Sequence, residues 1–159
     1  STEVQKLCDY TTNGDITSEA IDILVPKMVD TSIYTLASEL FAGRTAKAFQ
    51  ILDDLFVQHI EPIIIMSALS GHFVDCYRAK LAQMSKKSAN EALAAFNYPR
   101  NRSFVMTKAM NAVSRLSVDY LKSCVDILYN TNKLLNSSKT DRRLLIEQAL
   151  TKISVLKRI

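Results

Sequence analysis

The sequence contains little of what turns, sheets and disulfide frameworks require. Its 159 residues include three glycines, three prolines and no tryptophan. Because the strands of compact sheets are joined by turns rich in glycine and proline, this scarcity argues against an all-β fold. The three cysteines, Cys8, Cys76 and Cys124, are odd in number and far apart in the chain. They predict no disulfide framework and favour a reducing, cytoplasmic compartment.

Two further absences concern membranes and processing. No run of about 18 apolar residues is free of charge, so we expect no membrane-spanning segment. The first residues show no basic flank followed by an apolar run, so we expect no signal peptide. The sequence does not begin with Met, so we expect either a fragment of a longer protein or a processed chain.

Motifs for catalysis and cofactor binding are also missing. There is no GxxxxGK[ST], GxGxxG, CxxC or HExxH pattern, so we expect no catalytic residues, no cofactor, no metal and a non-catalytic role. His72, Asp75 and Cys76 do fall on adjacent turns of one predicted helix, where a Cys–His pair could form an activated thiolate. The interpretation we prefer is that Cys76 is a small core residue, because most buried cysteines are structural.

What the sequence does contain is apolar residues at helical spacing. Hydrophobic residues make up 48% of the chain, as in a globular domain. Residues 41–83 predict two long helices joined by a corner at Glu61–Pro62, because proline suits the first turn of a new helix. The segment Ile63–Met66 is apolar all round, which indicates that the second helix is buried on several sides. His59 falls at helical spacing with the apolar face of the first helix.

Further helices are predicted on both sides of this hairpin. Residues 1–40 read as three short helices, with Gly43 as the expected C-terminal cap of the third. Ser88 opens a capping-box pattern, and Ser117 and Thr140 are expected to cap the last two long helices. No segment predicts a strand and no repeat is visible, so the predicted fold class is all-α.

The net charge of +4 conceals an asymmetry between the halves of the chain. Residues 1–75 hold 4 Lys and Arg against 11 Asp and Glu, whereas residues 76–159 hold 16 against 5. A basic half can bind nucleic acid, and Tyr98, Arg100 and Arg102 form a small aromatic-basic cluster that could contact a strand. The interpretation we prefer is that these charges are mostly solvated helix faces.

The order of three motifs resembles the delta-subunit family of bacterial DNA polymerase III, which belongs to the AAA+ clamp loader. The first motif is an E-x-x-K-L helix followed by a Gly-x-Ile-Thr turn. The second is an Ile-x-x-Leu-x-x-x-Leu helix that ends in Ala-Gly. The third is an A-x-x-x-L-x-x-L unit before a proline-initiated apolar helix. In this sequence they are Glu3–Leu7 with Gly14–Thr17, Ile33–Gly43, and Ala48, Leu52 and Leu55 before Glu61–Pro62.

The resemblance implies two parts. Residues 1–42 would be the remnant of the small helical AAA+ lid, and residues 43–159 a helical-bundle collar domain that packs with the other clamp-loader subunits. That collar supports loading of the sliding clamp onto DNA during replication. The sliding clamp would be contacted only through the missing N-terminal domain, and DNA only indirectly. The competing hypothesis is a stand-alone basic helical module that binds nucleic acid.

The last two predicted helices are the candidates for the contact with partner subunits. Both are long and strongly patterned, and one seam in 118–135 alternates spacings of three and four, with Asn132 as its polar exception. The alternative, equally supported, is that these stripes face only the rest of the domain. The candidate interface residues are Leu121, Val125, Leu128, Leu145 and Ile153.

Overall fold

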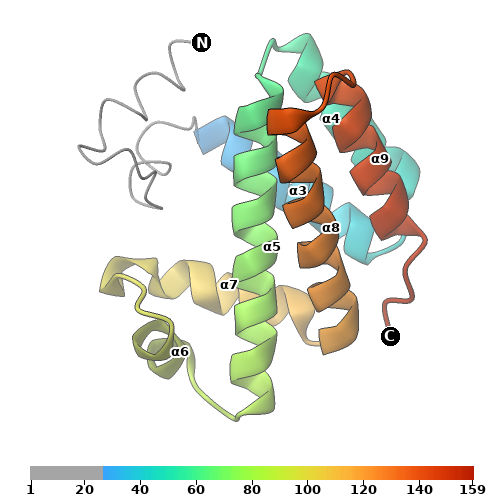
Figure 1. Cartoon of the computed structure of the whole chain (residues 1–159). Helices are drawn as coiled ribbons and strands as arrows, with labels where there is room; N and C mark the ends of the chain where they lie inside the picture. Colours follow the sequence, from blue (N-terminus) through green and yellow to red (C-terminus); the bar gives the residue numbers. More distant parts are fainter. Residues whose placement is uncertain (1–26) are drawn as a thin grey trace.

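The computed structural model describes residues 27–159, and in this range it contains helices and no strand. The all-α prediction is therefore confirmed for this part of the chain. The first two short helices predicted over residues 1–40, together with Cys8, lie outside the described residues. In chain order (Figure 1) the elements are α3 (Lys27–Phe41), α4 (Thr45–Val57), α5 (Pro62–Met84), α6 (Ala89–Ala95), the 3-10 helix η1 (Arg100–Arg102), α7 (Ser103–Val113), α8 (Val118–Ser137) and α9 (Arg142–Ser154).

Helix α5 is the central element of the fold. It begins with Pro62 in its first turn, as predicted, and continues for 23 residues, or about 34 Å at 1.5 Å per residue. Helices α3, α6, α7, α8 and α9 all pack against it. Within the apolar segment Ile63–Met66 only Ile63 keeps substantial exposure, which confirms that this part of the helix is enveloped.

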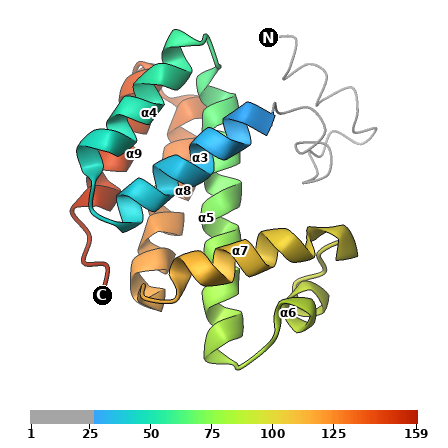
Figure 2. The same ribbon diagram turned by 180° about the vertical axis from the view of Figure 1, so that it is seen from behind.

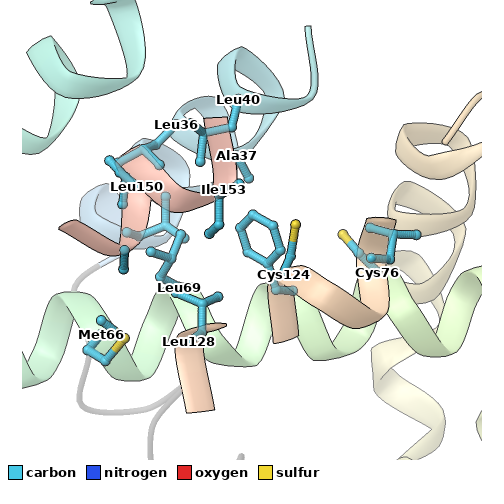
Figure 3. Packing of buried hydrophobic residues seen from close by; sticks show 14 of the residues in the cluster. Leu36, Ala37, Leu40, Met66, Leu69, Cys76, Cys124, Leu128, Leu150 and Ile153 are labelled. Atoms are coloured by element: carbon cyan, nitrogen blue, oxygen red, sulfur yellow. The ribbon is translucent and has the colours of Figure 1, made fainter. Parts of the chain in front are cut away.

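The surrounding helices divide between the two halves of α5. Figures 1 and 2 show α3, α4 and α9 around its N-terminal half and α6 and α7 around its C-terminal half, with α8 running alongside. In the close-up of Figure 3, Leu36 and Leu40 of α3 and Ile153 of α9 gather near Leu69 of α5 and Leu128 of α8. All five side chains are buried, so helices distant in the sequence share one hydrophobic core.

The corner between α4 and α5 is a left-handed turn. Helix α4 ends at Val57, and His59 adopts a positive φ of 60°. The His59 N–H donates to the Phe56 carbonyl oxygen at 2.9 Å, and the Ile60 N–H to the Leu55 carbonyl oxygen at 3.1 Å, a pairing that closes helix C-termini. His59 is therefore exposed in the turn, and its predicted place with the apolar face of the helix is wrong.

Side-chain caps begin three of the later helices. The capping box is present, because the Glu91 N–H donates to Ser88 Oγ at 3.2 Å and the Ser88 N–H donates to Glu91 Oε1 at 3.3 Å. Ser117 caps α8, as predicted. Thr140 does not cap α9. Asp141 does so instead, accepting at 3.1 Å from the N–H three residues further on, where its negative charge also complements the helix dipole.

Helix α3 is part of the same core as the later helices. Leu36, Ala37 and Leu40 are completely buried, and α3 packs against both α4 and α5. Gly43 follows with a positive φ of 79°, in keeping with its predicted role as a C-terminal cap, and a Cβ there would lie 2.8 Å from the Arg158 guanidinium. The core shows no division between residues 42 and 43. The boundary between a lid and a collar at that point stays a prediction.

If α3 is integral to this core, truncating Leu36 or Leu40 to alanine should destabilise the whole domain by about 2–5 kcal/mol in one cooperative transition, since each substitution leaves a cavity. Urea unfolding followed by helical circular dichroism measures this change. Met28→Ala is the matched control in the same helix, because Met28 is 54% exposed, and it should change the free energy by less than about 0.5 kcal/mol. Two separate transitions, the second unaffected by Leu36→Ala, would contradict a shared core.

Candidate functional site

Four of the five residues predicted to form a partner interface lie inside the domain. Leu121 and Ile153 have no exposed surface, and Leu128 and Leu145 are 1% and 5% exposed. Only Val125 is partly exposed. A side chain without accessible surface cannot contact a partner while the domain keeps this packing. The structure therefore supports the alternative, in which these apolar stripes face the rest of the domain.

The buried stripe of α8 differs from the predicted seam. Tyr120, Cys124 and Thr131 are buried, whereas Asn132 is exposed. The predicted seam assumes a spacing of 3.5 residues, and a straight helix of 3.6 residues per turn drifts away from that spacing. The Thr131 hydroxyl donates to the Ile127 carbonyl oxygen at 2.8 Å, which satisfies it within its own helix. Asn132 sets no register inside the domain.

Other apolar side chains on α8 and α9 are accessible to a partner. Tyr129, Leu134 and Leu144 are 62%, 42% and 46% exposed. They lie on two helices that pack side by side. Tyr129 and Leu134 are five residues apart and so point to different sides of α8. We refer to the three exposed residues together as the α8–α9 surface. Isolated exposed apolar residues are common on any protein, so exposure alone does not make these three residues an interface.

Most of the aromatic-basic cluster that was predicted to bind nucleic acid points towards α5 and not towards solvent. The Tyr98 hydroxyl donates to the Asp75 carboxylate, and Arg78 Nη1 donates to the Tyr98 oxygen at 2.8 Å. Arg102 Nη2 lies 3.3 Å from the second Asp75 oxygen in an ion pair. Of the three predicted residues only Arg100 is exposed. Tyr98 and Arg102 connect the segment between α6 and α7 to α5, so the predicted cluster does not form one outward-facing site.

Asp75 explains why this network forms. It is 7% exposed, and a buried carboxylate is costly unless charged or hydrogen-bonding groups compensate it. Asn97 supplies a left-handed turn with φ of 58°, which ends α6 and returns Tyr98 towards α5. Burial, followed by the Asp75 charge, raises the pKa of Tyr98 to about 12, which keeps its hydroxyl a donor. Sequence reasoning noted Asp75 but missed its partners, and the signal was a carboxylate on an otherwise apolar helix face.

The buried Cys–His pair lacks the chemistry of a catalytic thiol. Cys76 Sγ lies 3.7 Å from His72 Nε2, and both residues are buried. Burial raises the pKa of the Cys76 thiol well above its usual range, which disfavours the thiolate. Burial, followed by the charge of Lys108, lowers the pKa of His72 to about 4. The His72 ring packs edge-on against Tyr34 with centroids 4.6 Å apart, as a core residue would.

The described part of the chain offers few other sites. Across residues 27–159, no group of three His, Cys, Asp or Glu side chains gathers closely enough to bind a metal ion. None of the helices in this range combines the length and apolar character needed to cross a bilayer. A cavity of about 310 Å³ opens beside the Tyr98 network, between α3, α5 and the segment that precedes α7. Its lining includes Tyr34, His72, Asp75 and Arg102, whose contacts already serve the fold.

Removing the Tyr98 hydroxyl should weaken the domain. Tyr98→Phe leaves the buried Asp75 carboxylate without one donor, and we expect a loss of about 1–3 kcal/mol in the free energy of unfolding. Chemical denaturation measures it. Tyr129→Phe makes the same change on an exposed ring and should have almost no effect. Equal stability of the two variants would contradict the structural role given to the Tyr98–Asp75 bond.

His72 should give the domain a defined pH dependence. Its pKa in the folded state is depressed from 6.5 to about 4, so its contribution to stability is complete above pH 6.5 and is lost as the pH falls towards 4. The loss attributable to this group amounts to about 3 kcal/mol. We expect His72→Phe to flatten the acid limb of stability against pH, while His59→Asn in the exposed turn leaves that limb unchanged. An identical acid limb in wild type and His72→Phe would contradict the buried neutral imidazole.

Comparison with known proteins finds two relatives of this helical domain. The DNA polymerase III delta subunit of Bacillus subtilis (strain 168) is 26% identical over 98% of this chain and 44% of its own length. The solved Bacillus subtilis DNA clamp loader delta protein (YqeN) has the same fold, with a TM-score of 0.73 at 23% identity, covering 96% of this chain and 44% of that one. This chain thus spans less than half the length of these relatives.

The family comparison covers the elements described above from α3 to α9. The family profile described as "DNA polymerase III delta subunit, C-terminal domain" matches residues 30–153. These limits fall inside α3 at one end and near the end of α9 at the other. The chain therefore belongs to the family formed by the C-terminal domains of DNA polymerase III delta subunits.

Proposed function

We propose that this chain acts as the assembly domain of a clamp-loader delta subunit. In this role it packs with the other loader subunits into a collar that supports loading of the sliding clamp onto DNA. The observation that carries the proposal is the family match across residues 30–153, which includes almost every described helix. The role is non-catalytic and cytoplasmic. Contact with the sliding clamp belongs to the part of such a protein that precedes this sequence.

The same match makes the competing hypothesis less attractive. A stand-alone nucleic-acid-binding module is not favoured for a chain that belongs to this family. The inward turn of Tyr98 and Arg102 also removes two of the three side chains on which that hypothesis depended. The assembly role is therefore the main function we assign.

In this proposal the collar unit also includes α3, which precedes the predicted boundary at residue 43. The support is the core that α3 shares with α5, α8 and α9. Assignment of the preceding residues to an AAA+ lid stays a prediction.

We assign the contact with neighbouring subunits to the α8–α9 surface. Its outer residues, Leu134 and Leu144, are exposed, whereas the inner faces of the same helices are anchored in the core by Leu128 and Ile153. Arg143 connects the first turn of α9 to α4. It pairs with Asp53, and its guanidinium carbon lies 4.8 Å from the centroid of the Phe56 ring. Burying such apolar area contributes about 25 cal/mol per Å² before the costs of association.

Charge on the α8–α9 surface should separate assembly from folding. We expect Leu134→Glu and Leu144→Glu to keep the cooperative helical melt but to weaken co-elution with the other purified clamp-loader subunits by tenfold or more, an effect of about 1.4 kcal/mol. Leu128→Asp, in the core, should lose the melt and the co-elution together, because it buries an unpaired charge.

Met84→Glu supplies the matched control, since Met84 is an apolar residue at the far end of α5 that is also exposed, by 60%. It should alter neither the melt nor the co-elution. If Leu134→Glu and Leu144→Glu bind the other subunits like wild type, the contact lies elsewhere. If wild type itself does not co-elute, the assembly role is wrong for this chain.

A further inference from the structure

A groove opens between the short helix α6 and the segment that leads from it to α7. Its volume is about 510 Å³. We call it the α6 groove, and it is lined by Asn90, Leu93, Ala94, Tyr98 and Arg100. The first three of these residues are spaced by three and one, so they share one side of α6. In Figures 1 and 2 this end of the domain lies away from α4 and α9.

The walls of the α6 groove are attached to the rest of the domain. The Tyr98 N–H donates to the Leu93 carbonyl oxygen at 2.8 Å, which closes the C-terminus of α6 around the left-handed Asn97. The Tyr98 hydroxyl connects the following segment to Asp75 of α5. Helix α6 itself packs against both α5 and α7. A ligand would therefore meet a preformed surface, which lowers the entropic cost of binding.

The α6 groove combines an aliphatic floor with a polar edge. Leu93 lies at its base and is 4% exposed. Ala94 is exposed beside it and has only a methyl group, so it leaves the groove open. Asn90 and Arg100 are exposed and supply an amide and a guanidinium group. Small sites for peptide side chains are typically built in this way, with apolar area for contact and a few polar groups for orientation.

The surroundings of the α6 groove are strongly positive. Residues 76–117 include eight Lys and Arg and a single carboxylate, that of Glu91, which is engaged in the capping box of α6. Lys86 and Lys87 directly precede this helix and are exposed. Like Arg100, they have no ion pair within residues 27–159. A ligand that carries several carboxylates complements this charge.

We propose that the α6 groove binds an acidic peptide segment of a partner protein. One apolar side chain of the peptide occupies the floor at Leu93 and Ala94, and a neighbouring carboxylate pairs with Arg100. The Asn90 amide can both donate to and accept from the peptide backbone. Further carboxylates of the peptide are attracted by Lys86 and Lys87. This interaction is additional to assembly and does not depend on the α8–α9 surface.

The aromatic ring of the groove is poorly placed to stack on a base. The guanidinium carbons of Arg78 and Arg102 lie 5.3 and 5.6 Å from the centroid of the Tyr98 ring. The Tyr98 hydroxyl is already committed to Asp75. Sites for single-stranded nucleic acid depend on accessible aromatic rings, whereas the floor of this groove is aliphatic. The observations therefore favour a peptide over a nucleic-acid strand.

The test measures binding of two short labelled glutamate peptides to the complete chain by fluorescence anisotropy. One peptide carries a central leucine and the other has glycine in its place. The glycine peptide should bind about tenfold more weakly, because it leaves the apolar floor uncovered. Arg100→Glu should weaken binding of both peptides by about tenfold. Ala94→Trp fills the groove and should remove the advantage of the leucine peptide over the glycine peptide.

Matched controls make the same substitutions outside the groove. Arg115→Glu reverses an exposed charge beyond the end of α7, and Ala95→Trp enlarges an exposed alanine of α6 that does not line the groove. Both should bind the leucine peptide nearly as wild type does. The proposal is overturned if the controls weaken binding as much as the groove variants. It is also overturned if wild type binds the two peptides equally, or binds neither at low salt.

A second arm replaces the peptides by a labelled oligothymidylate. The proposal expects Ala94→Trp to leave binding of this strand unchanged. If Ala94→Trp and Arg100→Glu weaken it as strongly as they weaken the leucine peptide, the groove is a nucleic-acid site and the proposal is wrong. Both substituted residues are exposed, so the variants should keep the helical melt of wild type. They should also still co-elute with the other loader subunits, so failure here is distinguishable from failure of the assembly role.

Discussion

The fold depends on the burial of one long helix on nearly all of its sides. Helix α5 carries apolar residues around its circumference, and no single neighbour could cover them. Helices α3, α7 and α8 each cover part of it, and their inner faces meet in one core. To cover α5, the other helices turn their apolar faces inward, and residues such as Leu128 and Ile153 are buried inside the domain. Contacts with partners are left to the outer faces of the same helices.

Features set by neighbouring residues were predictable from the sequence. Pro62 at the start of α5 and the Ser88–Glu91 capping box follow from short-range rules, and both are present. Features set by tertiary packing were not. The shift from Asn132 to Thr131 on α8 depends on how α8 lies against α5, and a difference of about 0.1 residue per turn decides it over the length of the helix. The inward turn of Tyr98 depends on Asp75, a partner 23 residues earlier in the chain.

The candidate interface was the least predictable feature, and the reason is physical. A helix that packs into a core and a helix that packs against another subunit show the same apolar spacing. Leu121 and Leu145 fit both descriptions until the position of every other helix is known, and only then do they prove to be buried. The exposed apolar residues, which include Leu134 and Leu144, do not follow the apolar spacing of their helices. The contact residues that we propose are therefore ones that depart from amphipathic spacing.

The division between an interior built on α5 and an assembly face on α8 and α9 is the central claim. Hydrogen–deuterium exchange, compared for the free chain and for the chain assembled with the other loader subunits, tests it most directly. The account predicts slow exchange along Ile64–Phe73 in both states, and added protection on assembly confined to the exposed turns of α8 and α9 around Tyr129–Leu134 and Leu144–Thr151. Protection of Ile64–Phe73 that appears only on assembly, or no change on α8 and α9, would contradict it.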